Sequence, residues 1–273
     1  MKIIAQNINI LAPRVFDAVK RKDGSSIKAM ARKLLENGAS GLEVNLGGWR
    51  ASDAAMPWLV KQIRQVSNCP LFLSPIPSSL KDAVKEAGKG DIFINCVTAE
   101  RPHLKSMLNA ARCLGTGIVI LLTRKGFCPS CLDEILILAQ EVIETAERSG
   151  FDLERLVLDP ILRPRLSITA SGCIINRPDV TFFSEAIHLL GMLRPKKMKT
   201  AVGISSLSVG MKKDERKSLE RSALCLFEAS GLDYCIADCS NRQAAWQAEE
   251  TRFWPRQSDD VGLKGDLCST SQG

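Results

Sequence analysis

Polar residues stand at the ends of a series of short apolar runs in this chain, and most of them are neutral amides or hydroxyls. The set comprises Gln6, Asn7, Asn9, Glu43, Asn45, Ser74, Asn95, Thr98, Thr123, Asp159, Ser205, Ser206 and Asp238. Asp159 follows three apolar residues, where an unpaired carboxylate is costly. Amides, hydroxyls and one or two carboxylates are suited to binding a flat, polar heterocycle through hydrogen bonds.

The same residues argue against a metal centre and against covalent catalysis. His103 and His188 both lie away from the ends of the apolar runs. Cys128 and Cys131 form one CxxC, and a structural zinc site needs more ligands than this. We therefore expect no metal ion, and we expect the CxxC segment to be a loop that starts a helix. Each single Asn or Ser also has a structural alternative as a turn or helix-cap residue.

Composition and charge exclude several classes of protein. The net charge is +7, but the basic residues are spread along the chain without interleaved aromatics, so no nucleic-acid partner is expected. No apolar stretch reaches the roughly 18 residues that a membrane-spanning helix needs. The N-terminus lacks the pattern of a secretion signal, so the sequence predicts a cytoplasmic protein whose ten cysteines are thiols.

The elements that must position these polar groups are eight strands, each followed by helical sequence. The predicted strands are 3–9, 41–47, 70–74, 91–97, 117–123, 156–159, 200–205 and 235–238. The predicted helices are 16–21 and 25–37, then 54–67, 78–87, 103–114, 132–149, 181–193, 214–230 and 241–253. Apolar strands alternating with amphipathic helices indicate a parallel sheet covered by helices.

Eight such units predict a single-domain α/β protein, a (β/α)8 TIM barrel over residues 1–253. The alternative is an open, doubly wound sheet, but the first strand is not followed by a GxGxxG phosphate loop. Residues 254–273 are polar and unpatterned and are predicted to be a mobile tail. In a barrel, binding and catalytic groups lie at the C-terminal ends of the strands, which is where the polar residues stand.

Several motifs resemble those of the pterin-binding barrels, and most closely those of methyltetrahydrofolate:corrinoid protein methyltransferases. They are GLEVNLG at 41–47, INCVTAER at 94–101, LVLDPILRP at 156–164, VGISSLS at 202–208 and CIAD at 235–238. The similarity extends over nearly all of residues 1–253. Dihydropteroate synthases resemble the chain more distantly.

The resemblance implies roles for individual residues. Asn95 and Asp159 match the family's pterin-binding Asn and Asp, while Asn9, Asn45 and Asp238 match other motif positions. With Ser74, Gly203 and Ser205, the residues Asn9, Asn45, Asn95 and Asp159 make up the predicted pterin site, and Ser206 is the predicted catalytic residue.

Four positions depart from the family pattern. Ser74, followed by Pro75, replaces an Asp; Ser206 replaces an Asn; and Gln6 and Asn7 replace a Glu-Arg pair. A serine cannot offer two acceptor oxygens to an aminopyrimidine edge, so weaker or altered pterin binding is expected.

The resemblance further implies a methyltransferase that moves a methyl group between methyltetrahydrofolate and the cobalt of a corrinoid. The corrinoid would be carried by a separate partner protein, and the barrel would be a homodimer. Two alternatives remain open. One is a barrel that has lost this activity and serves as a binding or regulatory subunit. The other is an enzyme for a different ligand, with Lys125, Arg163 and Arg165 available for an anionic group.

Overall fold

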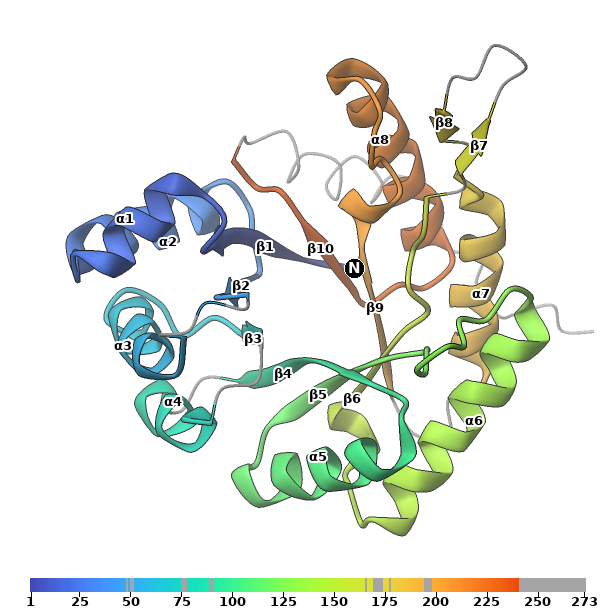
Figure 1. Cartoon of the computed structure of the whole chain (residues 1–273), viewed down its shortest axis with the longest axis horizontal. Helices are drawn as coiled ribbons and strands as arrows, with labels where there is room; N and C mark the ends of the chain where they lie inside the picture. Colours follow the sequence, from blue (N-terminus) through green and yellow to red (C-terminus); the bar gives the residue numbers. More distant parts are fainter. Residues whose placement is uncertain are drawn as a thin grey trace, which may run out of the picture.

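The closed sheet at the centre of the molecule consists of eight parallel strands in the order β1, β10, β9, β6, β5, β4, β3, β2 (Figure 1). The computed structural model describes residues 1–47, 49, 52–74, 78–88, 91–164, 166–168, 174–176, 178–193 and 198–240. The barrel strands are β1 (Lys2–Asn9), β2 (Gly41–Asn45), β3 (Leu71–Ser74), β4 (Ile92–Thr98), β5 (Gly117–Leu121), β6 (Leu156–Asp159), β9 (Lys199–Gly203) and β10 (Tyr234–Ala237). The expected (β/α)8 barrel is thus confirmed.

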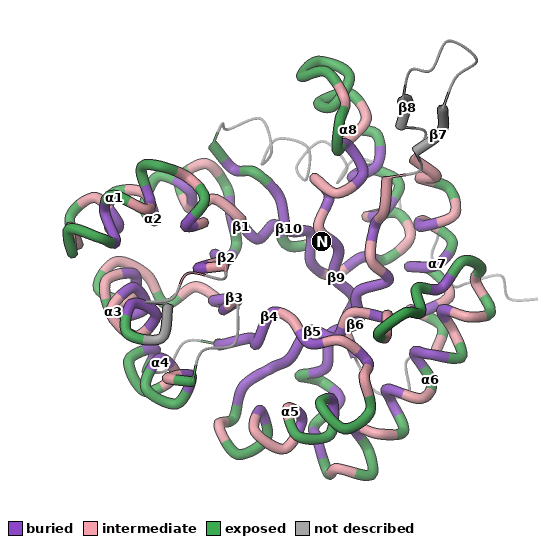
Figure 2. Tube along the Cα trace, viewed as in Figure 1, coloured by how far each residue is buried: buried purple, intermediate pink, exposed green. Residues whose placement is uncertain are grey.

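Helices surround the sheet and pack their apolar sides against it (Figures 1 and 2). Within the described residues these are α1 (Pro13–Lys20), α2 (Gly24–Glu36), α3 (Ser52–Arg64), α4 (Leu80–Ala87), α5 (Arg101–Leu114), α6 (Leu132–Arg148), α7 (Val180–Met192) and α8 (Lys213–Ala229). Their ends follow local chemistry. Asp23 caps α2 by accepting from the Ser26 amide at 3.0 Å, and Gly115 ends α5 in the left-handed conformation.

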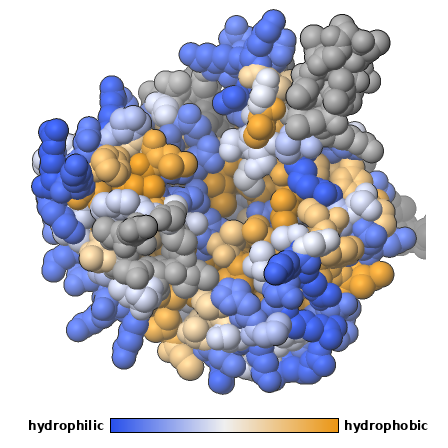
Figure 3. Space-filling view, in the orientation of Figure 1, coloured by the Kyte–Doolittle hydropathy of each residue, from blue (hydrophilic) through white to orange (hydrophobic). Residues whose placement is uncertain are grey.

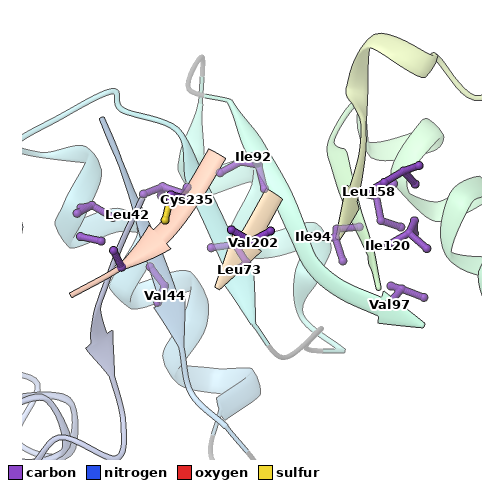
Figure 4. Packing of buried hydrophobic residues seen from close by; sticks show 14 of the residues in the cluster. Leu42, Val44, Leu73, Ile92, Ile94, Val97, Ile120, Leu158, Val202 and Cys235 are labelled. Carbon is purple, nitrogen blue, oxygen red and sulfur yellow. The ribbon is translucent and has the colours of Figure 1, made fainter. Parts of the chain in front are cut away.

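The strands separate two apolar layers, because successive side chains point to opposite faces. The outer layer lies between strands and helices and includes Leu42, Val44, Ile120 and Leu158 (Figure 4). The inner layer fills the barrel near the N-terminal ends of the strands and contains Ile4, Phe72, Phe93, Val119, Val157, Ala201, Tyr234 and Ile236. The Phe72 and Phe93 rings stack with centroids 4.6 Å apart. Because this inner layer fills the N-terminal end of the barrel, polar side chains inside the barrel lie toward its C-terminal end.

The structure adds two features that the strand pattern did not predict. The segment predicted as strand 200–205 stops at Gly203, and Ile204–Ser206 form a turn of 3₁₀ helix, closed by the Leu207 amide donating to the Ile204 carbonyl at 3.1 Å. Between β6 and α7, the short strands β7 (Leu166–Ile168) and β8 (Ile174–Asn176) pair antiparallel.

Other expectations fall partly outside the described chain. The predicted helix 241–253 and the predicted tail 254–273 both lie outside the described residues. In the part that is described, no helix combines the length and apolar character required to cross a membrane.

Candidate functional site

Three buried polar side chains converge at the C-terminal ends of the strands, a region that we name the barrel mouth. Asn95 follows Phe93 by two residues and Asp159 follows Val157 by two, so both point to the inside of the barrel above the inner apolar layer. Glu43 lies between Leu42 and Val44, which face outward. The exposed fractions are 7% for Glu43, 6% for Asn95 and 8% for Asp159.

Glu43 and Asn95 are joined across strands β2 and β4. The Asn95 Nδ2 donates to Glu43 Oε1 at 3.0 Å, and the Asn45 Nδ2 donates to the same oxygen at 3.2 Å. Burial raises the pKa of Glu43 to about 7, although these two hydrogen bonds act in the opposite direction. The second oxygen of Glu43 and the Asn95 carbonyl oxygen bind nothing among the described residues.

Asp159 ends β6 and is the second buried carboxyl of the mouth. Its Oδ1 accepts from the Ile161 amide at 2.7 Å. Burial raises its pKa to about 7, and the Ile161 hydrogen bond offsets only part of this effect. Burial, then Asp159 and then Glu43 raise the pKa of the Cys96 thiol to about 12, so both carboxyls lie within electrostatic reach of Cys96. The Asp159 Oδ2 has no hydrogen-bond partner in the described part of the chain.

Asn9 and Asn45 are engaged by the protein itself. The Asn45 Oδ1 accepts from the Gly47 amide, and the Asn9 Oδ1 accepts from the Leu11 amide, both at 2.9 Å. In the sheet register Asn9 lies beside Asn45, which lies beside Ser74. Asn9 therefore holds the turn at Leu11, while Asn45 links a separate turn at Gly47 to Glu43.

The serine positions lie at the ends of β9, which neighbours the strand of Asp159, and of β3, which lies between the strands of Glu43 and Asn95. The Ser205 Oγ donates to Gln6 Oε1 at 3.2 Å. Ser206 is half-buried, and its hydroxyl forms no hydrogen bond with the described residues. A Cβ added at Gly203 would lie 3.8 Å from the Ser206 Oγ, so Gly203 borders that hydroxyl. Ser74 is half-buried at the end of β3.

Two of the strand-end polar residues close the barrel. The Asn7 Nδ2 donates to Asp238 Oδ1 at 2.6 Å, and the Cys239 amide donates to Asn7 Oδ1 at 2.8 Å. These contacts fasten the end of β1 to the segment that follows β10. Asn7 and Asp238 consequently have a structural role that their position in the sequence did not distinguish from ligand binding.

The loop after β5 is held by its own contacts. The Thr123 Oγ1 donates to the Phe127 carbonyl at 2.7 Å, and Arg124 forms an ion pair with Glu141 on α6. Arg163 donates to the Pro129 carbonyl, and Arg165 lies outside the described residues.

The two cysteines of this loop bear out a helix-start role. Cys131 is the N-cap residue of α6, and the thiols of Cys128 and Cys131 are exposed. Across the described residues, no group of three or more His, Cys, Asp and Glu side chains is placed to hold a metal ion.

Glu43 is the residue of the mouth that the sequence interpretation left out of the predicted site. The available signal was a carboxylate between two apolar residues in a strand, where burial demands hydrogen-bond partners. A second unpredicted contact supports the turn at Ser205 and Ser206. The buried Ser208 Oγ donates its single proton to Glu220 on α8 and lies 3.2 Å from the Ser205 carbonyl oxygen.

The molecular surface around the mouth is mixed in character. In the space-filling view the outer rim is largely hydrophilic, whereas hydrophobic atoms show between the helices and toward the centre (Figure 3). A ligand seated there would contact apolar walls and the few polar groups described above, which is the usual composition of a small-molecule site.

Comparison with solved structures identifies proteins of the same fold. Dihydropteroate synthase from Xanthomonas albilineans in complex with 7,8-dihydropteroate superposes with a TM-score of 0.64 at 17% identity, over 93% of this chain and 92% of that one. Yersinia pestis DHPS with a pterine-sulfa conjugate gives 0.63 at 13% identity, over 92% and 93%. Stenotrophomonas maltophilia dihydropteroate synthase gives 0.63 at 16% identity, over 93% and 94%. No protein-family model matches the chain. The chain therefore shares the (β/α)8 fold of these synthases.

Proposed function

We propose that this chain is a pterin-dependent transferase that moves a methyl group between methyltetrahydrofolate and the cobalt of a corrinoid protein. The observation that carries the pterin part is the placement of Asn95 and Asp159 at the same end of the barrel, each buried and each with an oxygen that no described residue engages. The motif resemblance supplies the methyl-transfer part, and the fold shared with pterin-binding barrels is compatible with it.

The free atoms of the mouth complement an aminopyrimidine ring. The Asp159 carboxylate would accept from the amine and ring N–H of the guanidine-like edge, which is a charge-assisted pair of contacts. The Asn95 side chain has a carbonyl oxygen that no described residue engages, and one N–H beyond the one given to Glu43. Donors on the ligand favour the ionised form of Asp159, so binding lowers the pKa that burial has raised.

The transfer step requires one more group, a hydrogen-bond or proton donor near the pterin nitrogen. When the methyl leaves the pterin nitrogen, the electron pair of the broken bond stays on that nitrogen, and a hydrogen bond or proton stabilises it. Ser206 has a half-buried hydroxyl that no described residue engages, and it is the residue we assign to this contact. The cobalt of the corrinoid is the methyl acceptor, or the donor in the reverse direction. The partner protein would dock over the mouth, and the barrel would act as a homodimer.

Calorimetry followed by a transfer assay tests the proposal. We expect tetrahydrofolate and methyltetrahydrofolate to bind, and 4-aminobenzoic acid, which is present in one X. albilineans synthase structure, to bind more weakly. A reduced corrinoid protein mixed with enzyme and methyltetrahydrofolate should then change its absorbance as it is methylated. Binding of both partners without turnover would indicate a regulatory subunit. Absence of folate binding would indicate a different ligand and would reject the proposal.

A further inference from the structure

Glu43 is a buried titratable group that the proposed reaction leaves without a role. It is 7% exposed and lies on β2, facing the mouth between Asn95 and Asn45. A carboxylate in this position would be costly unless a cation or several donors compensated its charge. Within the described chain, no lysine or arginine forms an ion pair with it.

The hydrogen bonds of Glu43 determine which oxygen can carry a proton. Its Oε1 accepts from both the Asn95 and the Asn45 amides, at 3.0 and 3.2 Å, so both of those contacts require an acceptor. The proton of the neutral acid must therefore reside on Oε2. No described residue accepts a hydrogen bond from that oxygen, which makes it a donor available to a ligand.

The groups that face Glu43 from neighbouring strands do not favour its ionisation. Cys96 on β4 is a thiol whose pKa burial raises, so it supplies no charge, and Asp159 on β6 is a second buried acid and supplies no cation. Gln6 on β1 and Ser74 on β3 are uncharged. In agreement with this geometry, burial raises the pKa of Glu43 to about 7.

We infer that Glu43 takes part in ligand binding as a neutral acid, donating a hydrogen bond from Oε2 to an acceptor atom of the heterocycle. The inference rests on the proposed pterin function and adds a specificity rule to it. Asp159 binds the donor edge of the ring, whereas Glu43 requires a carbonyl oxygen or an unprotonated ring nitrogen on another edge. The ligand class is therefore a heterocycle with a guanidine-like edge and a separate acceptor, which a pterin satisfies.

Ligand binding then requires opposite protonation states of the two carboxyls. Asp159 must lose its proton and Glu43 must keep its proton, so affinity should pass through a maximum near neutral pH. Glu43→Gln retains an acceptor for the two asparagines and replaces the Oε2 hydroxyl by a permanent N–H donor. This variant should lose the alkaline decline in affinity, whereas the wild type should keep it.

Calorimetric titration with tetrahydrofolate between about pH 5 and about pH 9 provides the test. At the alkaline end we expect Glu43→Gln to bind at least about tenfold more tightly than the wild type, since about two pH units above its pKa only a small fraction of Glu43 is protonated. Glu36→Gln, on the exposed face of α2, is the matched control and should follow the wild type.

A second measurement is independent of the variant. Titration of the wild type at about pH 8 in buffers of different ionisation enthalpy should reveal uptake of up to one proton per ligand bound. If the wild type binds folate but takes up no proton and Glu43→Gln keeps the alkaline decline, the role of Glu43 is wrong and the pterin function stands. If the wild type binds no folate at any pH, both proposals fail together.

Discussion

The polar residues at the strand ends fall into two groups when their hydrogen bonds are compared. Asn9 and Asn45 use their side-chain oxygens on backbone amides of the following turns. Asn95 and Asp159 are both more than nine-tenths buried, and each keeps an oxygen that no described residue engages. An oxygen that no described residue engages is available to a donor on a ligand, so residues of the second kind are the better candidates for ligand contacts.

Asp159→Asn tests the main ligand contact. The amide offers one acceptor oxygen and an N–H that opposes the donor edge of the ring, so we expect tetrahydrofolate binding to weaken by about ten- to a hundredfold. Calorimetry gives the affinity, and thermal melting checks the fold. Unchanged affinity in a folded variant would favour a different ligand, and a large drop in melting temperature would indicate a structural role for Asp159.

Ser206→Asn tests whether the serine impairs or supports transfer. The longer amide extends a donor toward the nitrogen on which charge develops, so a catalytically poor wild type should transfer methyl groups faster after the change. If the wild type already transfers methyl groups rapidly and Ser206→Asn slows it, then Ser206 is an adapted catalytic donor.

Ser74→Asp adds a charged acceptor and should strengthen pterin binding. The following Pro75, which lies outside the described residues, restricts the backbone and can direct the new carboxylate away from the ring.

At the scale of the elements, close packing between strands leaves no room for extra atoms at some glycines. A Cβ added to Gly117 at the start of β5 would overlap the Phe93 ring and lie 3.1 Å from the Arg155 carbonyl oxygen. The ring cannot move aside easily, because it stacks on Phe72 inside the barrel.

Gly117→Ala should therefore destabilise the fold by about 1–3 kcal/mol, as overpacking of a filled core usually does. Chemical denaturation measures the loss. Gly24→Ala is the control, since its added Cβ meets only the flexible end of the Gln62 side chain. Equal effects of the two substitutions would contradict the packing argument.

At the scale of the whole molecule, the buried carboxyls link stability to pH. The pKa values of Glu43 and Asp159 are both raised to about 7, above the ordinary values that apply to the unfolded chain. Between those ordinary values and about pH 7, the unfolded chain has released protons that the folded protein still holds. Each group therefore lowers the free energy of unfolding as pH rises through this window, and the penalty is complete above about pH 7.

We expect the ligand-free protein to be less stable at about pH 8 than at about pH 5, and Glu43→Gln to reduce this difference. Urea denaturation of the wild type and the variant at both pH values measures it. The glutamine variant should gain stability relative to the wild type as pH rises. The opposite trend would mean that a cation compensates Glu43, which would also contradict its neutral state in the mouth.

The sequence by itself determined the barrel, the approximate bounds of its strands and helices, and the face on which polar residues gather. These properties follow from local periodicity, because apolar runs predict buried strands and amphipathic stretches predict helices. The same local information did not predict that the strand beginning near Lys199 ends at Gly203 and turns, because the end of that strand depends on where its pairing with β10 stops.

Only the tertiary structure decided which strand-end residues are free. Asn7 meets Asp238 from 231 positions away, and Asn95 meets Glu43 from 52 positions away. Whether an asparagine serves a turn, a barrel closure or a ligand depends on such distant partners, which have no periodic signature in the chain. The burial that raises the pKa of Glu43 and Asp159 likewise arises only when eight strands close around the two carboxyls.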